Sequence, residues 1–170
     1  SLSMAKDLSA ATKTVTDAVT IYANENESVS SMLNKAQPTV LLSAASGMSS
    51  SSSADAIQGI LNQFNLSEDQ AMHVADTVEK LSSEIALDFS KGCDTISQSI
   101  ATSGSVVNEA GMSFEKYAAL VSTTAEKTRV SGSQIGNAFK TIFSRISRSK
   151  DGLTTDAEMS DAEAALKSVG

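Results

Sequence analysis

The chain has little of what most catalytic and disulfide-linked proteins depend on. Its 170 residues include one Cys, one His, one Pro and no Trp, and only 4% are aromatic. A single Cys cannot form a disulfide within the chain, which excludes a small disulfide-linked secreted scaffold. One His with one Cys cannot supply a His/Cys zinc site. So few aromatic side chains also argue against a base-stacking platform for single-stranded nucleic acid.

Positive charge and long apolar runs are scarce as well. The net charge is -7 and the isoelectric point is about 4.6, which disfavours a general binder of polyanions. The longest uncharged stretch, residues 36–54, contains seven Ser among its 19 residues. A segment this polar is not expected to insert into a membrane.

The chain does contain small side chains and a strong helical periodicity. It has 30 Ser and 14 Thr, and 41% of its residues are hydrophobic. Apolar residues recur at steps of three and four, which predicts amphipathic helices. These stripes occupy residues 8–22, 57–64, 71–85, 93–107, 114–125 and 135–146, with a weaker one over 29–42.

Capping signals delimit these helices. Ser67 with Gln70 and Ser131 with Gln134 have the spacing of capping boxes, in which each side chain satisfies a free backbone amide. Further helix starts are predicted at Ser90 and Ser113, and Gly111 is predicted as the residue after a helix end, where a left-handed conformation favours glycine. A final short helix is predicted from Ser160.

Three breaks divide the chain. Residues 24–27 interrupt the first stripe, and Pro38 disfavours a continuous helix through 29–42. The run Ser49–Ser53 is predicted to be a flexible joint. We therefore expect N-terminal helices over 1–50, a helical core over 51–150, and over 151–170 a turn and short helix that lead into the rest of a longer chain. The first residues, Ser1–Ser3, are interpreted as a remnant of protein expression.

No alternating pattern predicts a β-strand. The expected fold is all-α, a bundle of about six to seven short antiparallel helices joined by turns that contain Gly and Ser.

No residue pattern predicts catalysis, a cofactor or a metal. His73 has no second His with which to share a metal, and Cys93 lies on an apolar stripe, which favours a packing role. Its place near a helix start would tend to lower the pKa of the Cys93 thiol. The segment from Gly132 to Gly136 lacks the Lys and the preceding strand of a phosphate loop. We therefore expect a protein that is not an enzyme.

One charge cluster is a candidate interaction face. Six basic residues and no acidic ones lie between positions 127 and 150, namely Lys127, Arg129, Lys140, Arg145, Arg148 and Lys150. They could bind an acidic partner or a phosphate backbone. The interpretation we favour is a solvated face that pairs with the acidic helices of the same module, because charges spread over several turns seldom form a compact patch.

Several sequence strings resemble the core region of tail tape measure proteins from long-tailed bacteriophages and related prophages. The specific ones are residues 126–129, Glu-Lys-Thr-Arg, and residues 136–145, Gly-Asn-Ala-Phe-Lys-Thr-Ile-Phe-Ser-Arg. The segments 64–76 and 93–110 follow the same order. The resemblance covers residues 28–170 and is weak before them.

The resemblance implies a structural virion protein that occupies the lumen of the tail tube, sets tail length and supports DNA ejection. It also implies assembly in the host cytoplasm, with tail tube protein, tail assembly chaperones, tail-tip proteins and copies of itself as candidate partners. The six basic residues could then contact the tube wall or DNA. The resemblance transfers no catalytic residue. Two alternatives stay open on the residues alone, a non-viral helical adaptor module and a helical segment that lies on membranes.

Overall fold

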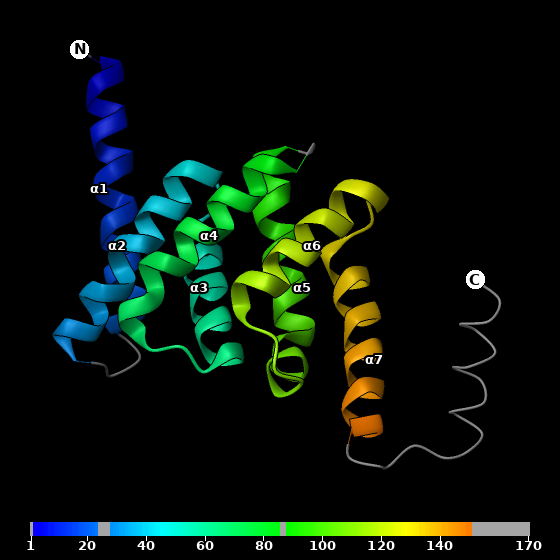
Figure 1. Ribbon diagram of the computed structural model, residues 1–170. Coiled ribbons are helices and arrows are strands. Elements are labelled where there is room, and N and C mark those ends of the chain that lie inside the picture. The colour runs from blue at the N-terminus through cyan, green and yellow to red at the C-terminus, as the bar shows by residue number, and fades with distance from the viewer. Residues whose placement is uncertain (1, 24–27, 86–87, 151–170) are drawn as a thin grey trace.

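A computed structural model describes residues 2–23, 28–85 and 88–150, and within these ranges it contains helices and no β-strand (Figure 1). The elements are α1 (Leu2–Ala23), α2 (Val29–Ser46), α3 (Ser50–Phe64), the 3-10 turn η1 (Glu68–Gln70), α4 (Ala71–Glu84), α5 (Phe89–Glu109), α6 (Phe114–Thr128) and α7 (Gly132–Lys150). The all-α prediction is confirmed. The break predicted at 24–27 and the helix predicted from Ser160 lie outside the described residues.

The helices form two layers. One layer, here called the odd layer, contains α1, α3, α5 and α7 side by side; the other, the even layer, contains α2, α4 and α6 (Figure 1). Each helix packs on its sequence neighbours in the opposite layer and on the next helix of its own layer. The chain therefore crosses between layers at every turn, as in helical repeat proteins.

Helices within one layer are parallel. In the odd layer, Gly132 of α7 lies against Thr95 of α5, and Gly136, four residues later, lies against Ser99. In the even layer, His73 contacts Glu115 at 2.9 Å, and the Ser122 hydroxyl donates to the Leu81 carbonyl oxygen at 3.2 Å. In each pair, the contacts advance in the same direction along both helices. Consecutive helices reverse direction, in agreement with the predicted antiparallel connections, and the layers add parallel pairs that short loops did not predict.

Glycine sets the distance between α5 and α7. A Cβ atom built on Gly132 would lie 2.3 Å from the Thr95 carbonyl oxygen, and one on Gly136 would lie 2.9 Å from that of Ser99. Only residues without a side chain allow the two backbones this close. The segment that lacked phosphate-loop features is therefore a helix-packing surface.

Most predicted caps are confirmed. Gln70 accepts from the Ser67 backbone N–H at 3.2 Å, and Gln134 accepts from that of Ser131 at 3.2 Å. Gly111 adopts φ of +92°, the left-handed region favoured by glycine. The start predicted at Ser90 is wrong by two residues. Asp88 caps α5, and its carboxylate accepts from the Ser90 N–H at 3.0 Å.

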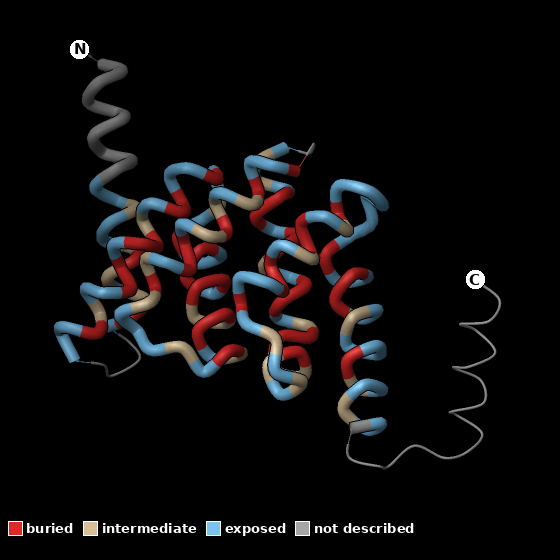
Figure 2. Tube along the Cα trace, viewed as in Figure 1, coloured by how far each residue is buried: buried red, intermediate tan, exposed pale blue. Residues whose placement is uncertain are grey.

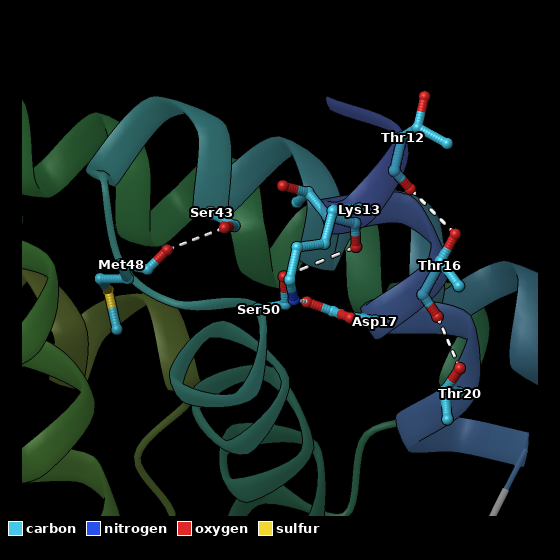
Figure 3. A network of polar contacts seen from close by, with 9 residues as sticks. Thr12, Lys13, Thr16, Asp17, Thr20, Ser43, Met48 and Ser50 are labelled. Atoms are coloured by element: carbon cyan, nitrogen blue, oxygen red, sulfur yellow. Dashed lines mark hydrogen bonds and ion pairs between the residues drawn. The ribbon is translucent and has the colours of Figure 1, made fainter. Parts of the chain in front are cut away.

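The predicted flexible joint at Ser49–Ser53 is wrong. Ser49 is the N-cap of α3, and its hydroxyl accepts from the Ser52 N–H at 3.0 Å. The hydroxyl of Ser50 donates to the Thr14 carbonyl oxygen of α1 at 3.5 Å, next to the Lys13–Asp17 ion pair (Figure 3). Serine hydroxyls favour helix starts because they satisfy free backbone amides, and here they also tie α3 to α1.

The predicted disruption at Pro38 is also wrong, because α2 continues through it. A helix can tolerate an interior proline when tertiary packing holds it, and Pro38 is buried.

The buried side chains form two clusters. The larger one extends from Leu42 to Phe143 and draws on α2 to α7, and the smaller contains Ala18, Tyr22, Ala36 and Ala54 from α1, α2 and α3. Residues on both sides of the predicted boundary at 50/51 contribute to each cluster.

The stripes predicted for 8–22 and 29–42 are wrong in part. Val15 is exposed on α1, and Val29, Leu33 and Leu41 are exposed on α2. Both helices lie at the end of a layer, so each has one face without a described neighbour.

Candidate functional site

The first part of the basic set surrounds the turn between α6 and α7. Lys127 lies in the last turn of α6, with its Nζ 3.9 Å from the Glu126 carboxylate. Arg129 ends α6 in a left-handed conformation with φ of +57°, and its N–H donates to the Ala125 carbonyl oxygen at 2.8 Å. Cations are favoured here because a helix C-terminus carries partial negative charge.

The second part lies along α7. Lys140, Arg145 and Arg148 are exposed, and Lys150 is the last residue of the helix. Within the described ranges, no acidic side chain forms an ion pair with Arg129, Lys140 or Arg145. The favoured interpretation, pairing with acidic helices of the module, therefore finds no support at these three positions.

The six cations do not gather at one place. Arg148 lies 16 residues after the start of α7, about 24 Å along the helix axis at 1.5 Å per residue. Arg145 follows Ile142 by three positions and shares its face, whereas Lys140 precedes Ile142 by two and projects from another side. Binding of a partner by this set stays a prediction. Of the six cations, Arg145 lies on the exposed face of α7 that also contains Ile142.

That face of α7 is apolar as well as basic. Ile135 and Phe143 are buried, but Ile142 and Ile146 are 48% and 46% exposed, and Ala138 is exposed. Buried positions of α7 lie on the side of α5, and exposed ones on the opposite side (Figure 2). The prediction that the whole stripe faces inward is wrong because α7 is the last described helix of its layer.

His73 and Glu115 form a surface pair between α4 and α6. His73 Nε2 lies 2.9 Å from Glu115 Oε1, and both side chains are about half exposed, at 52% and 49%. The hydrogen bond from His73 lowers the pKa of the Glu115 carboxyl below its usual value. His73 is exposed, which agrees with its interpretation as a surface or half-buried histidine without a metal, and its Glu115 partner was not predicted.

Cys93 is buried in the core of α5, as predicted for a packing residue. Burial raises the pKa of its thiol above the usual value, because a thiolate is poorly solvated there. The expected lowering by the helix start is wrong, since desolvation dominates.

Sequence patterns missed a polar cluster between α1, α2 and α3. Lys35 is 0% exposed, with Nζ 2.9 Å from Gln58 Oε1 and 4.7 Å from the centre of the Tyr22 ring. The Tyr22 hydroxyl lies 2.8 Å from that of Thr39. Lysine is rarely buried, so no periodicity rule places it inside, and only its apolar stem and this particular neighbourhood explain its position.

The described residues contain neither a metal-binding cluster nor a membrane-spanning helix. Among them, no three His, Cys, Asp or Glu side chains come together in a way that could hold a metal ion. None of the helices in the described ranges is both long and apolar enough to cross a membrane.

Comparisons with known proteins agree on one group. The profile of a family described as "Phage-related minor tail protein" matches residues 2–170. The chain is also 26% identical over 108 residues to the probable tape measure protein of Escherichia phage P2, covering 64% of this chain and 13% of that protein. The chain thus corresponds to a small part of this much longer relative. No solved structure matches.

The family match covers every described helix. The non-viral adaptor is not favoured by this match. The chain belongs to the phage-related minor tail protein family and is a structural component of a phage tail, and so of the virion.

Proposed function

We propose that the chain is a segment of a tape measure protein, which occupies the lumen of the tail tube and sets tail length. The observation that carries this proposal is its similarity to the probable tape measure protein of phage P2, together with a family match over residues 2–170. Assembly would take place in the host cytoplasm, before the tail is complete.

A ruler needs length, and the two-layered fold is short. An extended helix rises about 1.5 Å per residue, so 170 residues in one rod would reach about 255 Å. Stacked helices lie only about 8–10 Å apart, so the folded layers advance far less per residue. We therefore propose that the two layers open when the protein enters the tube.

The interior of the fold supports such an opening. Ser53, Ser99 and Ser103 are fully buried, and where α5 and α7 come closest, glycine and serine replace large side chains, although Ile135 and Phe143 are also buried between the helices. Small side chains bury little apolar area, at about 25 cal/mol per Å², so separating these helices costs less than separating a leucine-rich pair.

The proposed partners are other tail components, namely tube protein, assembly chaperones, tail-tip proteins and further copies of the chain. Exposed Arg145 and Arg148 could contact an acidic tube wall or DNA. We propose no catalytic role and no cofactor.

Protease protection tests the proposed location. Intact virions treated with a protease should retain this segment, as detected by mass spectrometry, while a protein on the tail exterior is cleaved. Virions whose tail tip has been triggered to open should lose the protection. Cleavage of the segment in intact virions at the rate of the exterior control would show that it does not lie in the lumen.

A further inference from the structure

Buried positions of the odd layer recur along the chain with a constant shift. Residues that are buried in α3 have buried equivalents 39 positions later in α5. The pairs are Ala54 with Cys93, Ile57 with Ile96, Leu61 with Ile100, and Phe64 with Ser103. α3 and α5 therefore occupy equivalent positions in the layer.

The same shift applied to α5 shows which side of α7 is uncovered. Ile135 and Phe143 of α7 are buried, like their equivalents Ile96 and Gly104 in α5. Three further positions are buried in α5 and exposed in α7, those of Ala138, Ile142 and Ile146, here called the α7 line. These residues follow one another at steps of four, so they lie on one side of the helix. The α7 line is thus a helix-packing surface that is exposed within the described ranges.

A second exposed apolar line lies on α2. Leu33 and Leu41, here called the α2 line, are eight residues apart and are both exposed. The α7 line also spans eight residues, so each line extends about 12 Å along its helix. Because α2 and α7 lie at opposite ends of the two layers (Figure 1), the two lines can meet only between copies of the chain.

A cleft opens next to the α2 line. It has a volume of about 490 Å³ and lies between α2, α3 and the segment that leads into η1. Asn34, which directly follows Leu33, lines the cleft from α2, and Leu61 and Leu66 give it apolar walls. A long side chain with an apolar stem and a polar end can therefore enter beside the α2 line.

The cleft is acidic. Glu68 and Asp69 line it and are exposed, and within the described ranges neither carboxylate forms an ion pair. No basic residue is among the described residues that line the cleft, since Lys35, which donates to Gln58 Oε1 at 2.9 Å, is fully buried. A guanidinium group suits such a cleft best, because it forms paired hydrogen bonds with carboxylates and is weakly hydrated.

α7 carries such a group beside its exposed line. Arg145 follows Ile142 by three residues and directly precedes Ile146, so its side chain projects next to both isoleucines. Arg145 is exposed, and the described residues hold no acidic partner for it. Opposite charges favour the acidic cleft over a second basic α7 as its partner. A phosphate backbone would leave the isoleucines exposed, whereas the α2 line covers them.

We propose that the cleft binds Arg145 of a second copy of the chain. In this contact the carboxylates of Glu68 and Asp69 accept hydrogen bonds from the guanidinium, and the α7 line packs on the α2 line. Because the two surfaces lie at opposite ends of one chain, the copies associate head to tail. The inference rests on the proposed function only in its partner, a further copy of the chain, and does not depend on the proposed place in the tail tube.

Charge reversal tests the contact in the 170-residue chain by sedimentation equilibrium. The unmodified chain should self-associate, and Arg145→Glu should weaken the association at least tenfold, because it places a third carboxylate beside Glu68 and Asp69. Lys140→Glu is the matched control, since it makes the same charge change on another side of α7 and should alter the dissociation constant less than threefold. A chain that stays monomeric at millimolar concentration, or equal weakening by both substitutions, would overturn the proposal.

A mixing experiment separates loss of the contact from loss of the fold. Glu68→Gln with Asp69→Asn should also weaken self-association at least tenfold, because it removes the charge of the cleft. An equimolar mixture of this variant with Arg145→Glu should nevertheless form dimers, since the first retains an intact α7 and the second an intact cleft. With both variants helical by circular dichroism, a mixture that stays monomeric would refute head-to-tail docking.

Cross-linking identifies the residues in contact. In an Arg145→Lys chain, a carbodiimide should join the new amine to Glu68 or Asp69, because this reagent links a lysine to a carboxylate that touches it. In a mixture of isotopically light and heavy chains, mass spectrometry should find this link between a light and a heavy chain. Links within one chain only, or equal yields from Lys140 to the same carboxylates, would contradict the proposed contact. These experiments use the isolated chain, whereas the place in the tail tube is tested on virions, so each proposal can fail without the other.

Discussion

The hydroxyl of Ser99 in α5 donates a hydrogen bond to the carbonyl oxygen of Gly132, the first residue of α7, over 2.7 Å. Both groups are buried, and the bond forms where the two backbones come closest. The small Ser99 side chain on α5 thus fits against Gly132 on α7, which has no side chain, and the hydrogen bond fixes the register of this helix pair.

Adding a methyl group at this contact should destabilise the fold. Gly136→Ala places a Cβ 2.9 Å from the Ser99 carbonyl oxygen and 2.7 Å from the Thr102 Cβ, so one helix must move. We expect a loss of about 1–3 kcal/mol in the free energy of unfolding, measured by urea denaturation.

The matched control is Gly59→Ala in α3, where an added Cβ has nothing within 4 Å. This variant should gain about 0.5–1 kcal/mol, because alanine is favoured over glycine inside a helix. Equal effects of the two substitutions would mean that α5 and α7 do not approach as described.

The Tyr22 and Thr39 side chains should be energetically coupled. Thr39 Oγ1 donates to the Lys35 carbonyl oxygen at 2.8 Å, so the Tyr22 hydroxyl is the donor in the bond between them. A double-mutant cycle with Tyr22→Phe and Thr39→Val should give a coupling energy of about 0.5–1.5 kcal/mol by urea denaturation.

The control cycle combines Thr39→Val with Tyr117→Phe, which belongs to the other buried cluster. Its coupling should stay below about 0.5 kcal/mol. A coupling between Tyr22 and Thr39 no larger than this control would refute the bond.

Acidification should weaken the His73–Glu115 pair. The pKa of Glu115 is lowered in the folded state by the His73 hydrogen bond, so its contribution to stability is present above the unfolded carboxyl pKa of about 4.3 and disappears as the pH falls through the lower folded value. Thermal unfolding between pH 3 and 6 should show a smaller loss on acidification for Glu115→Gln than for the unmodified chain.

Glu109→Gln, an exposed carboxylate at the end of α5, serves as the control for a general charge effect. Identical pH profiles for the two variants would argue against a specific contribution from the pair.

Local chemistry made much of the fold predictable. The stripes at 57–64, 93–107 and 114–125 and the boxes at Ser67 and Ser131 depend on neighbours within a few residues, and they are confirmed. The serine run was misread because hydroxyl residues suit both loops and helix starts. The cap formed by Ser49 and the contact of Ser50 with α1 distinguish the two.

Other features depend on distant parts of the chain. An apolar periodicity cannot tell that Ile135 meets α5 while Ile142 faces outward, because this depends on which helices lie beside α7. Burial of Lys35 depends likewise on Gln58 and Tyr22, which approach from two other helices. The six cations can be found by counting along the sequence. Their separation into a group at the α6–α7 turn and a group along α7 can be recognised only once the positions of these helices and of their neighbours are known.

The length of the tail is the most direct test of the proposed role. Residues 71–113 span one repeat, from the start of α4 to the residue before α6, and comprise 43 residues. Their in-frame deletion from the full-length protein, in a phage that encodes it, should shorten the tail by about 65 Å in electron micrographs if the segment is extended in the tube. An in-frame duplication should lengthen the tail by the same amount. Tails of unchanged length in both phages would contradict the account.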